Sequence, residues 1–255
     1  MEKLSKIGSY ELLAEPFHCD FSHHLFMGNL GNHLLNAADF HSNERGYGMH
    51  YLNTIQRTWV LSRLTIEMNE MPIAYERFRV DTWVDAVVRF FTSRNFRISK
   101  DNRVIGYGKR IWAMIDTATR QPVDILNIRD GLISQYVDVL TPCPIEKGSR
   151  VKISGDAKCV RSIATTYSDV DMNGHINSVK YIEHVLDLWA LDWYKQYRIK
   201  RFDIAYVAES HCGDVLNFYL EEEKEHTYAV RITKSNELTT KEIEVVRCKL
   251  VFIKN

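Results

Sequence analysis

The sequence predicts an α+β protein made of two tandem repeats, each an antiparallel sheet wrapped around one long helix. Three observations predict this architecture: a repeated strand pattern, a helical stripe near the start of each half, and a proline-rich segment between the halves. The chain has 255 residues, of which 45% are hydrophobic and 26% charged. This length and composition are typical of a folded protein with one large domain or two modest ones.

The strand pattern of the first half recurs in the second. The run 96–102 (FRISKDN) is echoed by 230–236 (VRITKSN), and the later β-rich run 109–115 by 247–253 at nearly the same offset. Short strands can resemble one another by chance, but the order of elements on either side favours duplication. The other strands that we expect from Thr, Val, Ile, Tyr and Trp content are 58–67, 76–84, 89–99, 201–207, 215–221 and 227–233.

One helix is expected at the start of each half. In the first, Gly46 is a stop signal; in the second, Asn177 is suited to cap the helix start, and Lys195 and Arg198 suit the dipole at its far end. The residues with the spacing of one helical face are Leu30, Leu34, Ala37 and Ala38 in the first half and Ile182, Val185, Leu186, Trp189 and Trp193 in the second.

The best candidate for a linker begins at Thr141-Pro142-Cys143-Pro144 and continues through Lys147-Gly148-Ser149. Two prolines this close cannot continue a helix or lie in a central strand. We therefore expect an N-terminal repeat over residues 1–140, a linker over 141–149 and a C-terminal repeat over 150–255.

Charge and cysteine content exclude several classes of protein. The 33 basic and 33 acidic residues balance, which argues against a general nucleic-acid binder, and no run of about 20 apolar residues predicts a membrane span. An odd number of cysteines without CxxC spacing favours reduced thiols over a disulfide framework or zinc ribbon. With no signal-peptide run in residues 1–21, we expect a cytoplasmic protein. The cysteines are Cys19, Cys143, Cys159, Cys212 and Cys248.

The most unusual segment is 169–177, in which polar and non-polar residues alternate. In an extended chain this period would place Asp171, Asn173 and His175 on one face. The alternative is an ordinary strand with one solvated face. Gly174, the acid, amide and imidazole combination, and the helix that follows favour a functional site.

The chemistry of this segment suits an attack on a carbonyl group. Amides at a helix start can receive an oxyanion, and Gly174 lets the backbone approach a substrate. Asn173 and His175 could polarise a carbonyl or hold a water that Asp171 helps to orient. A strong base is missing from the segment. Glu209 ends a hydrophobic run, where the residues alone favour a solvated edge charge.

A family resemblance rests on three segments. Residues 171–182 closely resemble the D-x-N-x-H-x-N-x-x-K-Y motif of acyl-acyl-carrier-protein (acyl-ACP) thioesterases, double-hotdog enzymes that end fatty-acid synthesis. The run 59–63 (WVLSR) and the pair Tyr206 and Glu209 look like two further segments of that family. The resemblance runs from about Phe17 to the C-terminus, and it implies two fused hotdog repeats.

The resemblance implies hydrolysis of fatty acyl-ACP by a catalytic set of Asp171, Asn173, His175 and Glu209, without metal or cofactor. Ser210 stands where plant relatives carry Cys, so a cysteine nucleophile at that position is excluded and water activation by Glu209 with His175 is favoured. The leaving thiol has a pKa near 8.5, judged by cysteine, and needs little help from an acid.

The first repeat is expected to supply the acyl-chain pocket, with Ala37 and Ala38 leaving room along its helix. It has Asn32-His33 near its helix start but no matching acid, amide and histidine alternation, and its six histidines from His18 to His50 lack metal-ligand spacing. The implied partner is acyl carrier protein. A basic run that could dock it, or simply complement a helix dipole, is Lys195, Arg198, Lys200 and Arg201.

Two other functions remain open at this point. Hotdog proteins also act on acyl-CoA, and a non-catalytic module could bind acyl thioesters. The catalytic set disfavours the second, because a sensor would not need it. Neither the preferred chain length nor the choice between a monomer and a homodimer can be read from these residues.

Overall fold

The computed structural model describes residues 4–148, 151–236 and 239–255, and the chain divides into two compact units, Met1–Lys147 and Gly148–Asn255. Residues 1–3 of the expected first repeat, Ser149 of the expected linker and Arg150 at the start of the expected second repeat lie outside the described residues. We call these two parts unit 1 and unit 2.

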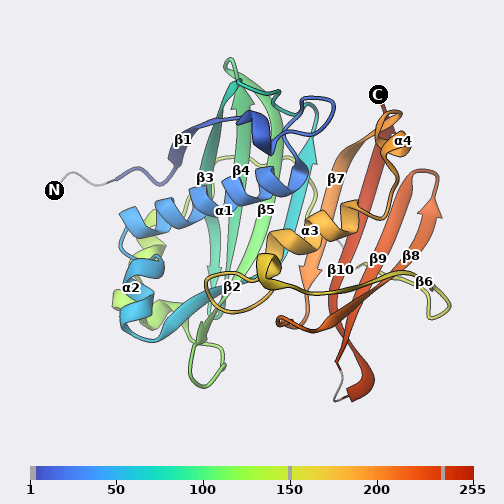
Figure 1. The fold of residues 1–255 in the computed structure, drawn as a ribbon. Coiled ribbons are helices and arrows are strands. Elements are labelled where there is room, and N and C mark those ends of the chain that lie inside the picture. The colour runs from blue at the N-terminus through green and yellow to red at the C-terminus, as the bar shows by residue number, and fades with distance from the viewer. Residues whose placement is uncertain (1–3, 149–150, 237–238) are drawn as a thin grey trace. The chain divides into compact units, whose positions relative to one another are not determined.

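Unit 1 is an antiparallel sheet in the order β1-β3-β4-β5-β2, with the long helix α1 lying across one face (Figure 1). Unpredicted from the sequence were β1, the short helix α2 and the 3-10 segments η1 and η2. The elements are β1 (Gly8–Leu13), η1 (Pro16–His18), α1 (Met27–Glu44), α2 (Met49–Thr54), β2 (Arg57–Met68), β3 (Arg77–Val88), β4 (Phe91–Lys100), β5 (Arg103–Asp116) and η2 (Ile125–Tyr136).

Helix α1 confirms the stripe expected in the first half. Leu30, Leu34, Ala37 and Ala38 are all buried, as their shared face requires. The helix ends at Glu44, and Gly46 follows with a φ of +79°, a left-handed conformation that glycine adopts without strain.

Unit 2 repeats this plan, with its sheet in the equivalent order β6-β8-β9-β10-β7 and α3 across one face (Figure 1). The expected strands of both units lie within observed ones, apart from one or two end residues. The elements are β6 (Lys158–Ala164), η3 (Tyr167–Asp169), α3 (Ser178–Leu186), α4 (Leu191–Tyr194), β7 (Tyr197–Tyr206), β8 (Val215–Lys224), β9 (Thr227–Asn236) and β10 (Thr239–Lys254).

The single helix expected in the second half is wrong beyond Leu186, where α3 ends. The ring of Trp189 packs 5.0 Å from that of Phe252, and the ring of Trp193 stacks 4.3 Å from that of Tyr197. These two tryptophans therefore have helical spacing but are held by aromatic packing against the sheet. Lys195 caps the short α4 and Arg198 lies on β7, so neither complements the dipole of α3.

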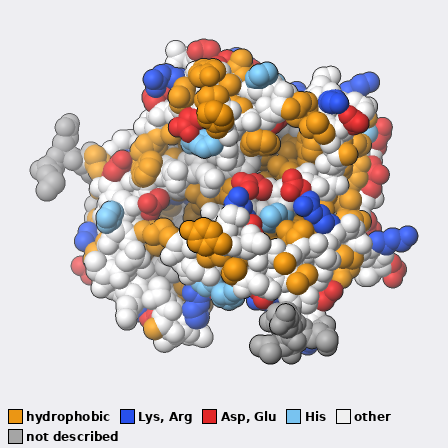
Figure 2. All heavy atoms as spheres, in the orientation of Figure 1, with side chains coloured by type: hydrophobic (Ala, Val, Ile, Leu, Met, Phe, Trp, Pro, Cys, Tyr) orange, Lys and Arg blue, Asp and Glu red, His pale blue; other side chains and the backbone are white. Residues whose placement is uncertain are grey.

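The surface carries charges of both signs. On the face shown in Figure 2, Lys and Arg side chains are interspersed with Asp and Glu side chains rather than gathered by sign. Among the helices of the described ranges, none is both long and apolar enough to cross a membrane.

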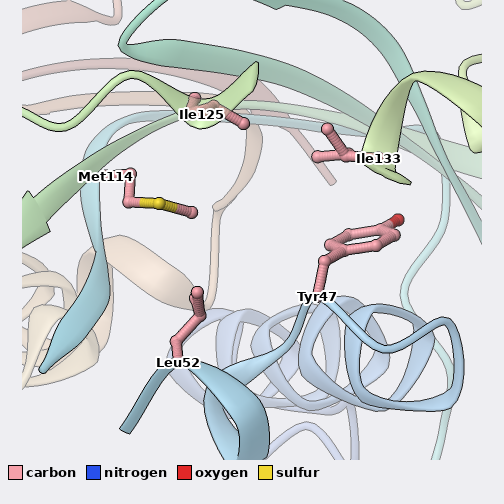
Figure 3. Close-up of a cluster of buried hydrophobic side chains, with 5 residues drawn as sticks. All are labelled: Tyr47, Leu52, Met114, Ile125 and Ile133. Atoms are coloured by element: carbon pink, nitrogen blue, oxygen red, sulfur yellow. The ribbon is translucent and has the colours of Figure 1, made fainter. Parts of the chain in front are cut away.

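A separate apolar cluster lies in unit 1, between α2, β5 and η2. The side chains of Tyr47, Leu52, Met114, Ile125 and Ile133 are buried and point toward one another (Figure 3). Around them is a narrow slot with no room for a water molecule in this conformation. Its lining residues are Tyr47, Trp59, Met114, Ile125, Ile128 and Ile133.

Candidate functional site

The segment expected to be extended is a tight turn, which we call the His175 turn (residues 169–177). The amide of Asp171 donates to the carbonyl oxygen of His175 at 2.8 Å, and that of Gly174 donates to the carbonyl of Asp171 at 3.0 Å. Gly174 has a φ of +81°. Since a left-handed residue reverses the chain, the alternating polar residues do not form one face of a strand.

Asp171 holds the backbone of this turn. Its Oδ1 atom accepts hydrogen bonds from the amides of Asn173 at 2.8 Å and His175 at 3.3 Å. An Asp side chain that accepts from amides two and four residues ahead fixes a turn in place. Asp171 therefore fixes the backbone that carries Asn173 and His175.

His175 and Glu209 meet at this turn. The Nε2 atom of His175 lies 3.3 Å from Oε2 of Glu209, and the two side chains are 25% and 35% exposed. The ring of His211 lies edge-on to that of His175, with centroids 5.1 Å apart. An imidazole beside a carboxylate, both open to solvent, can take a proton from a water molecule.

The loop that carries Glu209 is tied down at both ends. The ammonium group of Lys234 donates to the carbonyl oxygen of Glu209 at 2.7 Å and pairs with the carboxylate of Asp214 at 3.3 Å. The amide of Ile176 donates to the carbonyl of Ser210 at 2.9 Å, which joins this loop to the His175 turn. Lys234 and Asp214 were missed in the sequence, where Lys234 showed only as part of a repeated strand.

The helix that follows the turn begins as predicted. The side chain of Asn177 accepts from the amide of Val179 at 2.9 Å, which confirms it as the N-cap of α3. The amide of Gly174 is used within the turn, and those of Ile176 and Asn177 donate to Ser210 and Asp169. Most amides that were expected to receive an oxyanion are therefore engaged, whereas Asn173 is exposed at the tip of the turn.

A hydrogen-bonded pair, Asp169 and His184, fastens the turn to α3. Asp169 accepts from Nε2 of His184 at 2.9 Å, and its other carboxylate oxygen accepts from the amide of Thr166 at 2.7 Å. Burial raises the pKa of Asp169, but the hydrogen bonds from Thr166 and His184 outweigh it, and its pKa lies below the ordinary value.

Ser210 lies beneath the site. It is 1% exposed, with its hydroxyl oxygen out of reach of solvent. Nearby Tyr181 is also buried, and burial raises the pKa of its hydroxyl to about 12 while Ser210 opposes the rise. A residue at this position is therefore in no place to act on a substrate from the surface.

The basic run has acidic neighbours. Lys195 pairs with Asp192 at 2.7 Å and Arg201 with Asp203 at 2.8 Å. Arg198 and Lys200 both lie on β7. Acids that flank the run thus offset part of its positive charge. In the parts of the chain that the structure describes, no three His, Cys, Asp or Glu side chains are placed to hold a metal ion.

The two repeated units, each a sheet wrapped around a helix, define a double-hotdog protein, and the fold class expected from the sequence is confirmed. The model of the acyl-ACP thioesterase N-terminal domain matches residues 9–132, and that of the C-terminal domain matches residues 154–248. The chain belongs to the acyl-ACP thioesterase family.

Solved structures agree with this assignment. An acyl-ACP thioesterase from Bacteroides thetaiotaomicron is 46% identical, with 97% of this chain and 98% of that chain covered and a TM-score of 0.88. A 12:0-ACP thioesterase from Umbellularia californica is 16% identical, with both chains covered completely and a TM-score of 0.83, and it shows the shared fold.

Curated relatives match over part of their length. The oleoyl-acyl carrier protein thioesterase 2 of Arabidopsis thaliana, a chloroplastic protein, is 25% identical over 195 residues, which are 71% of this chain and 52% of that protein. An acyl-[acyl-carrier-protein] hydrolase of Cuphea viscosissima is 29% identical over 135 residues, 50% of this chain and 32% of that protein. The chain thus spans about half or less of these two relatives.

Proposed function

We propose that this chain hydrolyses the thioester of fatty acyl-ACP to free fatty acid and ACP, the step that ends fatty-acid synthesis. The observation that carries the proposal is the 3.3 Å approach of His175 Nε2 to Glu209 Oε2 beside an open turn. Membership of the acyl-ACP thioesterase family supports the substrate class. The relatives named above carry the same activity in their names.

The reaction needs an activated water and a place for negative charge. The pair of Glu209 and His175 takes a proton from water as its oxygen bonds to the thioester carbon. The side-chain amide of Asn173 donates to the oxyanion of the tetrahedral intermediate, since the amide of Gly174 is engaged in the turn. The C–S bond then breaks, and the thiolate takes up the proton and leaves. Asp171 holds His175 and Asn173 in position through the backbone.

We assign the acyl-chain pocket to unit 1. The apolar cluster around Tyr47 and Met114 offers the kind of surface that an alkyl chain prefers, and the narrow slot within it would open as a chain enters. Its aromatic and aliphatic side chains carry few polar atoms for a chain to desolvate. Helix α1, with Ala37 and Ala38 on its buried face, would line the approach.

Docking of acyl carrier protein is assigned to the basic run Lys195, Arg198, Lys200 and Arg201. Lys195 and Arg198 are its exposed members, and positive side chains steer an acidic partner. The double variant K195E/R198E should raise the KM for a carrier-linked substrate and leave that for a small thioester unchanged. An equal rise with both substrates would remove the docking assignment.

The proposed function is tested by thiol release from acyl-ACP and acyl-CoA substrates of matched chain length. We expect a higher kcat/KM for the ACP series. A preference for acyl-CoA would assign the other carrier, and binding of both without thiol release would make the protein a non-catalytic module. The same series, run from short to long chains, gives the preferred chain length.

Location and assembly stay predictions. All five cysteines are unpaired. Because a reducing compartment keeps thiols in this state, we propose a cytoplasmic location. Fractionation of the source cells tests it. A homodimer remains compatible with the sequence, and light scattering of the purified protein would decide between a dimer and a monomer.

A further inference from the structure

Unit 1 contains a turn that matches the His175 turn bond for bond; we call it the His24 turn (residues 18–26). The amide of Asp20 donates to the carbonyl of His24 at 2.7 Å, and that of His23 donates to the carbonyl of Asp20 at 2.9 Å. Oδ1 of Asp20 accepts from the amides of Ser22 at 2.8 Å and His24 at 3.2 Å. Each bond is within 0.1 Å of its counterpart in the His175 turn.

The equivalence extends to the flanks of the turn. A short 3-10 helix precedes each turn, a long helix follows each, and a bridge closes each one, Cys19 to Leu25 in unit 1 and Val170 to Ile176 in unit 2. His23 has a φ of +64° at the position of Gly174. An ordinary loop has no reason to reproduce so many bonds, so the two turns are copies of one structure.

The side chains at the reactive positions are also related. Asp20, Ser22 and His24 have the spacing of Asp171, Asn173 and His175, with serine in place of the amide. Oγ of Ser22 lies 2.9 Å from Nδ1 of His24 and 2.6 Å from Oδ1 of Asp20. This spacing is present in the sequence, but serine stands where the pattern of acid, amide and histidine requires an amide.

The partner loop identifies which residue stands in place of Glu209. The carbonyl of Pro72 accepts from the amide of Leu25 at 2.8 Å, as that of Ser210 accepts from Ile176 at 2.9 Å. Pro72 therefore corresponds to Ser210, and the preceding residue, Met71, corresponds to Glu209.

A second tie confirms the alignment of the partner loops. The amide of Ile73 donates to the carboxylate of Glu76 at 3.0 Å, as that of His211 donates to Asp214 at 2.9 Å. Lys100 pairs with Glu76 at 2.9 Å, as Lys234 pairs with Asp214. The loop framework is thus retained in unit 1, while the acid at the reactive position is not.

The neighbouring acid does not replace it. Glu70 pairs with Lys100 at 2.7 Å and also with Arg103, and both cations lower the pKa of its carboxyl. The loop beside the His24 turn therefore lacks a carboxylate that could act as Glu209 is proposed to act.

We infer that unit 1 carries a silent second copy of the hydrolytic site, in which Met71 replaces the carboxylate that pairs with the histidine. This inference rests on the proposed thioester hydrolysis by His175 and Glu209. It predicts that each chain has one active site, at His175. A carboxylate restored at residue 71 should make the second site, at His24, active on the same acyl thioesters.

The first test concerns geometry and needs no activity. In M71E the new carboxylate should face the His24 ring and stabilise its protonated form. The midpoint of the NMR titration of His24 should therefore rise by about one pH unit or more relative to wild type. M71Q, which has the same shape without the charge, is the matched control and should show no rise. Met71 is partly exposed, so both variants should fold, and a thermal melt verifies this. A folded M71E without the rise overturns the inference.

The second test rebuilds the site in the background E209Q. The combination S22N/H23G/M71E should raise acyl thioester hydrolysis at least about tenfold above E209Q alone. Adding H24A should abolish the gain, and M71Q in place of M71E should give none. Absence of a gain in a folded protein overturns the inference.

The two tests separate this inference from the proposed function. If wild type hydrolyses no acyl thioester, the proposed function fails, and the titration of M71E still decides whether Met71 occupies the place of the carboxylate. If wild type is active and E209Q is not, the proposed function stands, and the activity of S22N/H23G/M71E in the E209Q background decides the further inference.

Discussion

The ammonium group of Lys234 donates a hydrogen bond of 2.7 Å to the carbonyl oxygen of Glu209. The same group pairs with Asp214, so one side chain on β9 holds both ends of the loop that carries the proposed base. In unit 1, Lys100 holds the corresponding loop through Glu76. The fold thus repeats the tie, while only unit 2 keeps the carboxylate.

Removing this tie should slow the reaction. We predict that K234M lowers kcat about tenfold to a hundredfold, because a small displacement of a reacting group is costly, with little change in KM. K100M is the matched control; it removes the corresponding tie in unit 1 and should leave kcat unchanged. Each variant should lose about 1–3 kcal/mol of unfolding free energy. Equal kcat values for K234M and K100M, or failure of K234R to recover part of the rate, would contradict this positioning role.

The carboxylate of Asp171 should matter through the backbone. D171A leaves the amides of Asn173 and His175 without their acceptor, and we expect kcat to fall at least about tenfold. D171N keeps an oxygen that can accept and should retain more activity. The counterpart D20A breaks the same bonds in unit 1 and should cost similar stability without loss of turnover. Steady-state kinetics and urea unfolding of the three variants test this, and a full loss of activity in D171N would point instead to the charge of Asp171.

The hydrogen bond between Asp169 and His184 should make the free energy of unfolding depend on pH. Because the folded-state pKa of Asp169 lies below its ordinary value, the unfolded chain binds the proton more tightly. The stabilisation is therefore present above the ordinary pKa of about 3.9 and is lost as pH falls through the folded-state pKa. We expect D169N to be less stable than wild type by about 1–2 kcal/mol at pH 7 and the difference to shrink toward pH 3. Urea unfolding across this range measures it, and a constant difference would contradict the assignment.

The apolar slot in unit 1 predicts a change in chain-length preference. M114A removes a buried side chain from the cluster in Figure 3 and should cost about 2–5 kcal/mol of unfolding free energy. If the acyl chain ends in the slot, the volume left by the Met114 side chain should shift the highest kcat/KM toward longer acyl chains. Leu52 is equally buried but does not line the slot, so L52A is the control for lost stability. A loss of stability without a shift in preference would make the cluster ordinary core.

Sequence alone predicted the elements whose pattern is local. Leu30, Leu34 and Ala37 lie on the buried face of helix α1, as their spacing predicted. The stripe that continues to Trp189 and Trp193 was misleading, because these side chains serve aromatic packing on the sheet. Spacing cannot distinguish a buried helical face from aromatic residues that meet a neighbouring strand.

The residues of the candidate site could be proposed from the sequence, whereas their geometry could not. The alternation of polar and non-polar residues over 169–177 predicted an extended segment. In the structure, Gly174 and the carboxylate of Asp171 reverse the chain there. The ties made by Lys234 and Asp214 could not be foreseen, because they depend on strands brought together by the sheet. The His24 turn was missed for a different reason: Ser22 and His23 stand where the other copy has Asn173 and Gly174.

In the proposed reaction, Glu209 and His175 activate the water that cleaves the thioester. The most direct measurement is kcat of E209Q for thiol release from acyl-ACP, with the melting temperature as a check on folding. We predict a fall of about 10²–10⁴-fold at an unchanged melting temperature. Undiminished turnover by folded E209Q would contradict the account.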